Sequence, residues 1–268
     1  MPEGHTLHRL AREHRARFGG TVVRASSPQG RFAEGAAAID GSTLVRAEAY
    51  GKHLLHHYSS GVLLHVHLGL YGTFTSGAGS PPPPVGALRL RLANDAGWAD
   101  LRGPTACELL TPGEAEALIA RLGPDPLTRR PDGTRAFERI ARSRTSIAAL
   151  LMDQSVMAGV GNVYRAEVLF RHQLDPFLPG RALPREAFDT LWADLVTLMR
   201  AGVRTGRIVT LRDEDRPRRT PGSRLTREES VYVYRRAGEP CRVCGTAVRT
   251  VQLVARNLFW CPACQRPA

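Results

Sequence analysis

Hydrophobic and polar positions along the chain change their spacing near residue 130. Residues 5–18 place apolar side chains at helical intervals, and Gly19-Gly20 ends that pattern. Between residues 21 and 110, short apolar runs alternate with turn residues, which is typical of strands in an antiparallel sandwich or barrel. These runs are 21–23, 43–45, 53–58, 62–68, 87–92 and 106–110.

Beyond about residue 130 the apolar spacing becomes helical. Residues 146–154 are apolar on one face, 163–172 continue the helical period, and 186–202 form an amphipathic pattern. The Gly-rich segment 157–162 interrupts the helices. Residues 212–230 are dense in Arg, Pro, Asp and Glu, which predicts an exposed, mobile loop.

Four of the five cysteines form two C-x-x-C pairs separated by sixteen residues. Each pair can hold one side of a tetrahedral ion, and the gap suits a β-hairpin. Disulfides or a redox dithiol fit less well with the doubled motif in a cytosolic chain. We therefore expect one structural Zn²⁺ with no open coordination position. Its ligands would be Cys241, Cys244, Cys261 and Cys264. Cys107 is left over and predicted to be a buried, small apolar residue.

These patterns together predict an α+β protein of three parts. Residues 1–125 would form a β-sandwich with a flanking helix, 126–230 a helical domain, and 231–268 a zinc-finger β-hairpin. Several Arg residues surround the cysteine pairs, which favours contact with nucleic acid, although zinc ribbons also bind proteins.

Composition and charge narrow the class of partner. The chain is 43% hydrophobic, enough for a core, and its net charge of +12 favours a polyanionic partner. No apolar run approaches the ~18 residues of a membrane span, and the N-terminus lacks a signal-peptide layout. We therefore expect a cytoplasmic protein without membrane contact.

One basic residue differs from all the others. Of the 37 basic residues, 36 are Arg and one is Lys, at position 52. A compositional bias towards Arg would leave Lys52 as a chance survivor. The alternative is that position 52 needs a primary amine, which can lose its proton and do chemistry, whereas a guanidinium stays charged.

Motifs along the whole chain resemble the formamidopyrimidine-DNA glycosylase and endonuclease VIII family of base-excision repair enzymes, and more closely the endonuclease VIII branch. Each motif is weak alone, but their order is specific. They are Pro2-Glu3-Gly4, Gly51-Lys52-His53-Leu54, His67-Leu68-Gly69-Leu70-Tyr71-Gly72, Arg121-Leu122-Gly123-Pro124-Asp125, Leu150 to Gln154 with Ala158 to Tyr164, Gly238-Glu239-Pro240-Cys241, and Arg256 before Cys261.

The resemblance implies a β-sandwich, a helix–two-turns–helix DNA-binding domain and a zinc finger, and it assigns catalytic roles to four residues. Once Met1 is removed, Pro2 would attack the sugar C1′ as a secondary amine, and the resulting cationic iminium would drive elimination of the 3′ phosphate. Glu3 would protonate the sugar ring oxygen. Lys52 would handle phosphate and proton transfer, and Arg256 would grip phosphates beside the lesion.

Five further residues match DNA-binding positions of the family. Leu70 and Tyr71 match the residues that fill the space left by an extruded base, and Arg102 matches another void-filling position. Arg121 and Asn162 match backbone-binding positions, although a simple helix N-cap is an alternative role for Asn162.

The predicted substrate is damaged DNA, bound by a monomer as a duplex and also as a single strand. The chain lacks the Met and the Arg-Phe wedge of the purine-directed branch, which favours oxidised pyrimidines and abasic sites over 8-oxoguanine. Gly69 departs from the polar residue of endonuclease VIII. A catalytically silent DNA-binding paralogue and a zinc-ribbon transcription or translation factor are the alternatives. Histidines 53, 56, 57, 65 and 67 lack a nearby carboxylate cluster in the sequence, so we expect no second metal site there.

Overall fold

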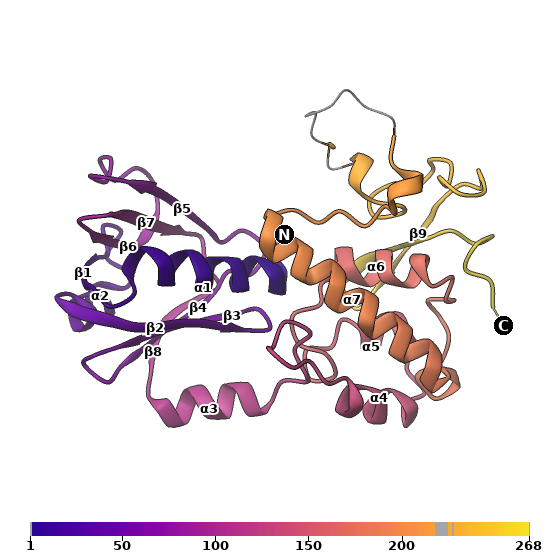
Figure 1. Ribbon diagram of the computed structural model, residues 1–268, viewed down its shortest axis with the longest axis horizontal. Coiled ribbons are helices and arrows are strands. Elements are labelled where there is room, and N and C mark those ends of the chain that lie inside the picture. The colour runs from indigo at the N-terminus through magenta and orange to yellow at the C-terminus, as the bar shows by residue number, and fades with distance from the viewer. Residues whose placement is uncertain (1, 218–224, 227, 268) are drawn as a thin grey trace. The chain divides into compact units, whose positions relative to one another are not determined.

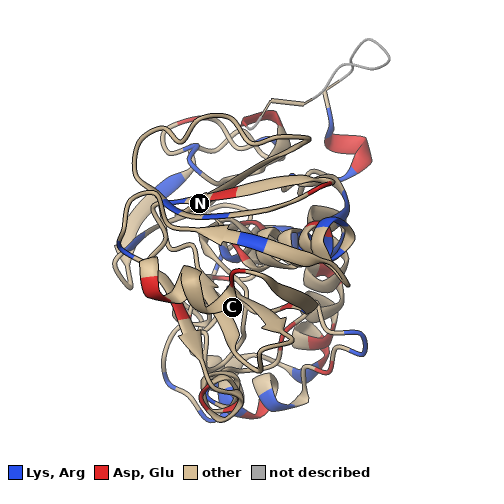
Figure 2. Cartoon of the chain, turned by 90° about the vertical axis from the view of Figure 1, so that its left-hand side faces the viewer, with Lys and Arg blue, Asp and Glu red and all other residues tan. Residues whose placement is uncertain are grey.

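A computed structural model describes residues 2–217, 225–226 and 228–267 of the 268-residue chain. It consists of two compact units, Met1–Arg121 and Leu122–Ala268 (Figure 1). Within the described residues, none of the helices combines the length and apolar character needed to cross a membrane. Basic and acidic residues occur on helices, strands and loops alike on the side drawn in Figure 2.

The first unit is built on an antiparallel ladder of eight strands in the order β5-β7-β6-β1-β2-β3-β4-β8. Buried apolar and polar residues alternate most clearly in β6, as the period of two requires for a strand with one buried face, whereas β3 and β4 are buried at consecutive positions. The strands are β1 (Val22–Ser26), β2 (Ser42–Tyr50), β3 (His53–Tyr58), β4 (Leu63–His67), β5 (Thr73–Ala78), β6 (Leu88–Asn94), β7 (Gly97–Arg102) and β8 (Ala106–Leu110).

Strand β1 divides the ladder into the two layers of a β-sandwich, as the sequence predicts. Its first residues pair with β2, and its last three pair with β6. Both layers contribute to one core, in which Leu44, Leu54 and Leu64 meet Leu90 and Leu92. Helix α1 (Gly4–Phe18) packs on β2 and β3 and completes this core.

Two strands of the sandwich, β5 and β7, are not predicted by the hydrophobic pattern. Strand β5 is rich in Thr, Ser and Gly and mostly exposed, so it lacks the apolar alternation on which the prediction depends. The unit also contains two short helices: α2 (Ala33–Ile39) joins β1 to β2, and α3 (Pro112–Ala120) follows β8. Helix α3 begins with a capping box in which Thr111 and Glu114 satisfy each other's backbone N–H groups.

The second unit is helical, as expected from the change in spacing. Its helices are α4 (Thr134–Ala141), α5 (Ile147–Leu150), α6 (Asn162–Arg171), the short 3₁₀ helix Gly180–Ala182, and α7 (Arg185–Thr205). Helix α6 is buried along most of its length, whereas α7 buries one face and ends at Gly206 in the left-handed conformation that favours glycine.

The C-terminal part of this unit carries a hairpin of β9 (Arg249–Leu253) and β10 (Arg256–Trp260). Two strands alone are marginally stable, and β10 is held by packing on α6. The predicted loop 212–230 contains the 3₁₀ turns Asp213–Asp215 and Glu228–Ser230, and its residues 218–224 and 227 lie outside the described residues.

Candidate active site

The strand register gathers three connections at one end of the sandwich. Tyr50 pairs with His53, His53 with His67, and His67 with Ala106. The connections 51–52, 68–72 and 103–105 therefore leave the sheet at the same end. Lys52, Leu70 and Tyr71 lie on these connections, so the fold brings together residues that are distant in sequence.

Helix α1 points its N-terminus at this same end. The Arg15 guanidinium donates to the Ala47 carbonyl at 2.7 Å, and Gly20 N–H donates to Leu44, so the helix runs antiparallel to β2. From Arg15 back to the helix start is roughly 18 Å at 1.5 Å per residue. From Ala47 to the β2–β3 turn is a comparable roughly 16 Å. The start of α1 therefore lies at the end of the sandwich that carries the β2–β3 turn (Figure 1), which brings Pro2 and Glu3 to the level of Lys52.

Pro2 and Glu3 precede the first turn of α1. Pro2 is half-buried, whereas Glu3 is fully buried and occupies the N-cap position with an extended backbone. The Glu3 side chain makes no capping hydrogen bond to the helix, so helix capping does not explain its identity. Met1 lies outside the described residues.

Lys52 occupies the second position of a two-residue turn between β2 and β3. Gly51, at the first position, has φ 56°, which suits the Gly-first turn of a tight hairpin. The side chain of Lys52 is close enough to His53 and His67 to lower the pKa of both imidazoles, although burial lowers them more. The only Lys of the chain thus lies among neutral imidazoles.

Leu70 and Tyr71 project from the β4–β5 connection. Leu70 is 40% exposed and Tyr71 is 85% exposed, which is unusual for large apolar side chains. The connection is braced by Thr105, whose N–H donates to His67 O at 2.9 Å. Gly69 has φ 65°, and a Cβ there would lie 1.9 Å from Thr105 Oγ1. This close packing explains why a polar side chain is absent at position 69.

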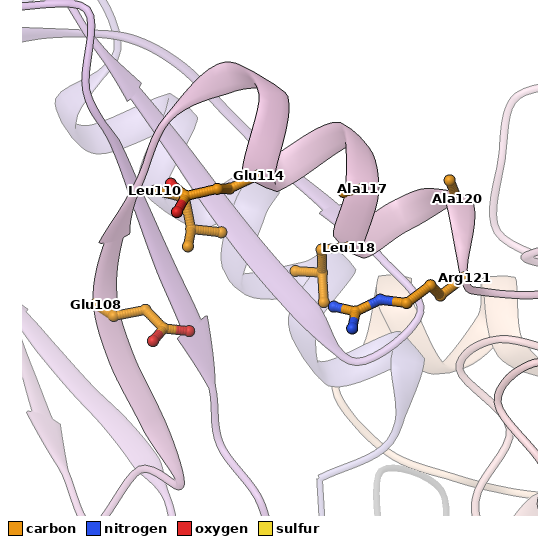
Figure 3. A pocket seen from close by; sticks show the side chains of 7 residues that line it. All are labelled: Glu108, Leu110, Glu114, Ala117, Leu118, Ala120 and Arg121. Atoms are coloured by element: carbon orange, nitrogen blue, oxygen red, sulfur yellow. The ribbon is translucent and has the colours of Figure 1, made fainter.

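Arg102 and Arg121 differ in how they are held. The Arg102 guanidinium donates to Thr75, Val85 O and Asp100, so it is tied to its own sheet. Arg121 is exposed at the end of α3 and lines an apolar groove of about 550 Å³ opposite Glu108 (Figure 3). Of the two, Arg121 has the freer guanidinium for a phosphate contact.

The second unit brings Asn162 next to the residue that follows Arg256. The Asn162 amide donates to Asn257 O at 2.9 Å, and its Oδ1 accepts from buried Arg165. Asn162 is the first residue of α6, and Gly161 is the N-cap, so the capping role considered for Asn162 falls to Gly161. Two predicted phosphate-binding residues thus lie at neighbouring positions.

The hairpin turn before Arg256 has an unusual backbone. Val254 and Ala255 have φ 52° and 55°, the conformation of both central residues in a type I′ turn. This conformation is costly for a β-branched residue. The strained turn fixes where β10 begins, and with it the position of Arg256.

The four cysteine thiols converge as a zinc site requires. All four Sγ atoms lie within 4.8 Å of one another. The Cys241–Cys264 and Cys244–Cys261 separations are 3.9 and 3.5 Å, too long for disulfides. Tetrahedral Zn–S bonds of ~2.3 Å place sulfurs about 3.8 Å apart. The residues therefore fit one structural Zn²⁺.

Glu167 is a structurally important side chain that the sequence pattern did not single out, whereas Cys107 is one that it did. Glu167 is fully buried in α6 and accepts hydrogen bonds from the N–H groups of Tyr232, Val233 and Tyr234 and from Thr210 Oγ1. An acidic residue flanked by the apolar residues Ala166 and Val168 is the signal that could have revealed it. Cys107 is half-buried, and burial raises the pKa of its thiol to about 12, which agrees with an unreactive packing role.

This combination of features is typical of one class of DNA-repair glycosylase. The features are a β-sandwich that begins with Pro-Glu, a lone Lys on an adjoining turn, a helical unit and a four-cysteine hairpin. Residues 1–107 match the formamidopyrimidine-DNA glycosylase N-terminal domain, 122–213 its H2TH domain, and 238–267 the zinc finger found in FPG and IleRS.

The chain belongs to the formamidopyrimidine-DNA glycosylase and endonuclease VIII family. It is 55% identical to Endonuclease 8 1 of Mycobacterium tuberculosis, covering 99% of this chain and 100% of that protein. It is 32% identical to formamidopyrimidine-DNA glycosylase of Methylococcus capsulatus, covering 99% of each. The greater identity to the endonuclease agrees with the branch predicted from the motifs.

Solved structures agree with the fold. The crystal structure of MutM (FPG) from Thermus thermophilus has a TM-score of 0.77 at 30% identity, covering 98% of each chain. The Lactococcus lactis Fpg complex with DNA containing an abasic site has a TM-score of 0.81 at 21% identity, covering 99% of this chain and 100% of that one. The chain is therefore a DNA glycosylase of the base-excision repair type.

Proposed function

We propose that this protein is a bifunctional DNA glycosylase and abasic-site lyase that removes oxidised bases, with pyrimidines favoured. The observation that carries the proposal is the convergence of Pro2, Glu3 and Lys52 at one end of the sandwich. DNA binding alone requires none of the three. The catalytically silent paralogue therefore leaves their combination unexplained.

The chemistry follows from the order of these groups. An α-amino group has a pKa of about 8, so a useful fraction of Pro2 is unprotonated near neutral pH once Met1 is removed. Attack on C1′ breaks the bond to the base, which leaves with the proton released from the Pro2 nitrogen. Glu3 protonates the ring oxygen as the C1′–O4′ bond breaks, which opens the sugar and forms an iminium without an N–H to lose, and Lys52 assists proton transfer and binds phosphate. Loss of the C2′ proton then sends electrons to the iminium nitrogen, and their return expels the 3′ phosphate and leaves a C2′=C3′ double bond.

The exposed side chains support a role in handling extruded bases. Extrusion leaves a gap in the stack, and Leu70 and Tyr71 are large, apolar and exposed on a braced connection. Arg121, Asn162 and Arg256 supply groups that suit phosphate contacts, which position the duplex without reading its sequence. Binding of a monomer to damaged duplex DNA, and its weakening by salt, are part of the proposal.

Borohydride trapping on a duplex with one abasic site tests the lyase chemistry. We expect a covalent adduct at the N-terminal peptide, identified by mass spectrometry, together with strand cleavage. A chain with an N-terminal tag that blocks the Pro2 amine is compared with the same tag at the C-terminus. No adduct on any substrate from the untagged chain, with Met1 removed and zinc bound, would support the silent paralogue.

The same assay sets the substrate preference. Duplexes with dihydrouracil, thymine glycol or 8-oxoguanine opposite each base are compared at equal enzyme concentration. We expect faster excision of the two pyrimidine lesions. Faster excision of 8-oxoguanine opposite cytosine would assign the chain a purine preference instead.

A further inference from the structure

A chain of hydrogen bonds runs across three strands from the residue after Lys52 to the surface. His53 Nδ1 lies 2.9 Å from His65 Nε2, and His65 Nδ1 lies 2.9 Å from a Glu108 carboxylate oxygen. Glu108 is directly opposite His65 in the β4–β8 pair. His53 is the diagonal neighbour of His65 across the β3–β4 pair. Local sequence does not indicate a carboxylate beside these histidines, because Glu108 is 43 residues from His65.

The Glu108 carboxylate determines which atom donates in each of these hydrogen bonds. An ionised carboxylate can only accept, so His65 Nδ1 donates to Glu108. A neutral imidazole has a single N–H, so His65 Nε2 accepts and His53 Nδ1 donates to it. The remaining nitrogen of His53, Nε2, then carries a lone pair. His65 is 5% exposed and Glu108 is 54% exposed, so the chain connects a buried ring with the solvent.

A second imidazole beside this chain has the opposite tautomer. The His67 ring lies 5.0 Å from that of His53, and its Nδ1 accepts from Gly69 N–H at 3.2 Å. Neutral His67 therefore keeps its proton on Nε2. Gly69 begins the connection that carries Leu70 and Tyr71, so the two rings join the Lys52 turn to that connection.

Burial, reinforced by neighbouring basic groups, keeps His53 neutral. Burial is the main cause that lowers the pKa of His53 to about 3, and His65, His67, Lys52 and Arg121 lower it further. Glu108 is the acidic partner of the chain, bonded to His65. A neutral His53 adds no positive charge beside the Lys52 ammonium.

We propose that His65 and Glu108 are positioning residues that hold His53 as its Nδ1–H tautomer and so orient the turn that carries Lys52. Neither residue needs to touch DNA. Only the expected effect on catalysis rests on the proposed function, because the tautomer is a property of the free protein.

The tautomers can be measured without substrate. Long-range ¹H–¹⁵N correlation spectra of protein labelled with ¹⁵N-histidine at neutral pH distinguish a protonated Nδ1 from a protonated Nε2. We expect protonated Nδ1 in both His53 and His65, and loss of that uniform state in Glu108→Leu. A protonated Nε2 on neutral His65 in the unmodified protein overturns the proposal, whatever its activity.

Single-turnover cleavage of a duplex with an abasic site tests the consequence. Glu108→Gln keeps an oxygen that can accept from His65 Nδ1, so its rate should stay within about twofold. Glu108→Leu should be slower by about tenfold, the factor for one lost hydrogen bond to a charged group, with DNA affinity unchanged. Equal rates for Glu108→Leu and the unmodified protein, or equal losses in both variants, refute the tautomer role.

A matched control separates this effect from general loosening of the sheet. Glu48 accepts a bond from His57 Nε2 at 2.7 Å, and His57 lies four residues beyond His53 along β3. Glu48→Leu removes the same type of contact at His57, roughly 13 Å along β3 from His53, together with the exposed Arg46–Glu48 ion pair. We expect it to leave the cleavage rate within about twofold, and a loss equal to that of Glu108→Leu contradicts the proposal. If the unmodified protein does not cleave at all, the proposed function fails while the spectra still decide the tautomer.

Discussion

Replacing Glu167 by Gln should destabilise the second unit strongly, because its carboxylate is an acceptor for four donors. One oxygen accepts from Val233 and Tyr234 N–H at 2.9 and 2.8 Å. The other accepts from Tyr232 N–H at 2.7 Å and Thr210 Oγ1 at 2.5 Å. No rotamer of a Gln amide can accept all four, because one of its two polar atoms is a donor.

The cost follows from the better of the two amide orientations. With Nε2 towards Thr210, the hydroxyl can accept from it and still donate to Ser230 O, which lies 3.1 Å away. Only the Tyr232 N–H is then left buried without a partner, at about 1–3 kcal/mol. The two bonds kept by Oε1 lose their ionic character, at about 1 kcal/mol each. The total is roughly 3–5 kcal/mol, a large part of the stability of a domain.

Amide hydrogen exchange read by mass spectrometry is the assay, since it resolves segments in a protein of two units. We expect the peptide spanning Tyr232 to Tyr234 to exchange about 100-fold faster or more in Glu167→Gln, together with faster zinc release. Glu138→Gln, an exposed Glu on α4, is the control and should change stability by less than about 0.5 kcal/mol. Unchanged exchange of that peptide in Glu167→Gln would refute the reasoning.

Three further predictions follow from burial, strain and metal binding. Burial lowers the pKa of His14 to about 3 and that of His56 well below its ordinary value, so both stay neutral when folded. The free energy of unfolding should therefore fall by roughly 2 kcal/mol per imidazole from pH 7 to pH 5. Urea titrations that coincide at the two pH values would contradict this prediction. Replacing Val254 by Asn and Ala255 by Gly should raise the free energy of unfolding of the hairpin by about 1–2 kcal/mol, because both new residues suit a type I′ turn. Urea denaturation measures this change, and a decrease would show that the strain is absent. Chelation of zinc should abolish amide protection in the β9–β10 hairpin while the sandwich keeps its own, and protection that survives metal loss, confirmed by elemental analysis, argues against a structural role.

The fold was largely predictable because the apolar spacing changes where the architecture changes. Alternating runs gave six of the strand regions, and Cys-x-x-Cys spacing gave the zinc site. Strand β5 was not predicted because its Thr, Ser and Gly residues face solvent and show no apolar alternation. Its pairing with β7 is a tertiary property, and hydrophobic spacing along one strand does not report it.

Candidate residues of the site were also identifiable, but their individual surroundings were not. Arg102 matches a void-filling position, but the motif did not indicate that its guanidinium donates to Thr75, Val85 O and Asp100. Asn162 was recognised at a helix start, yet its partner Asn257 lies 95 residues away. Such partners are set by how distant segments pack, which local sequence does not encode.

Strand register explains why the pairing of His65 with Glu108 near Lys52 could not be predicted from the sequence. His65 faces Glu108 because β4 and β8 pair at those positions, and a slip of one residue would turn His65 to the opposite face of the sheet. The slip would also move the apolar residues of β4 out of the core, so burial of Leu64 and Val66 fixes the register. The same hydrophobic contacts that stabilise the sandwich therefore place the Glu108 carboxylate one imidazole away from His53, the residue beside Lys52. An apolar substitution in the core that shifted β4 would disturb the site without touching any residue of it.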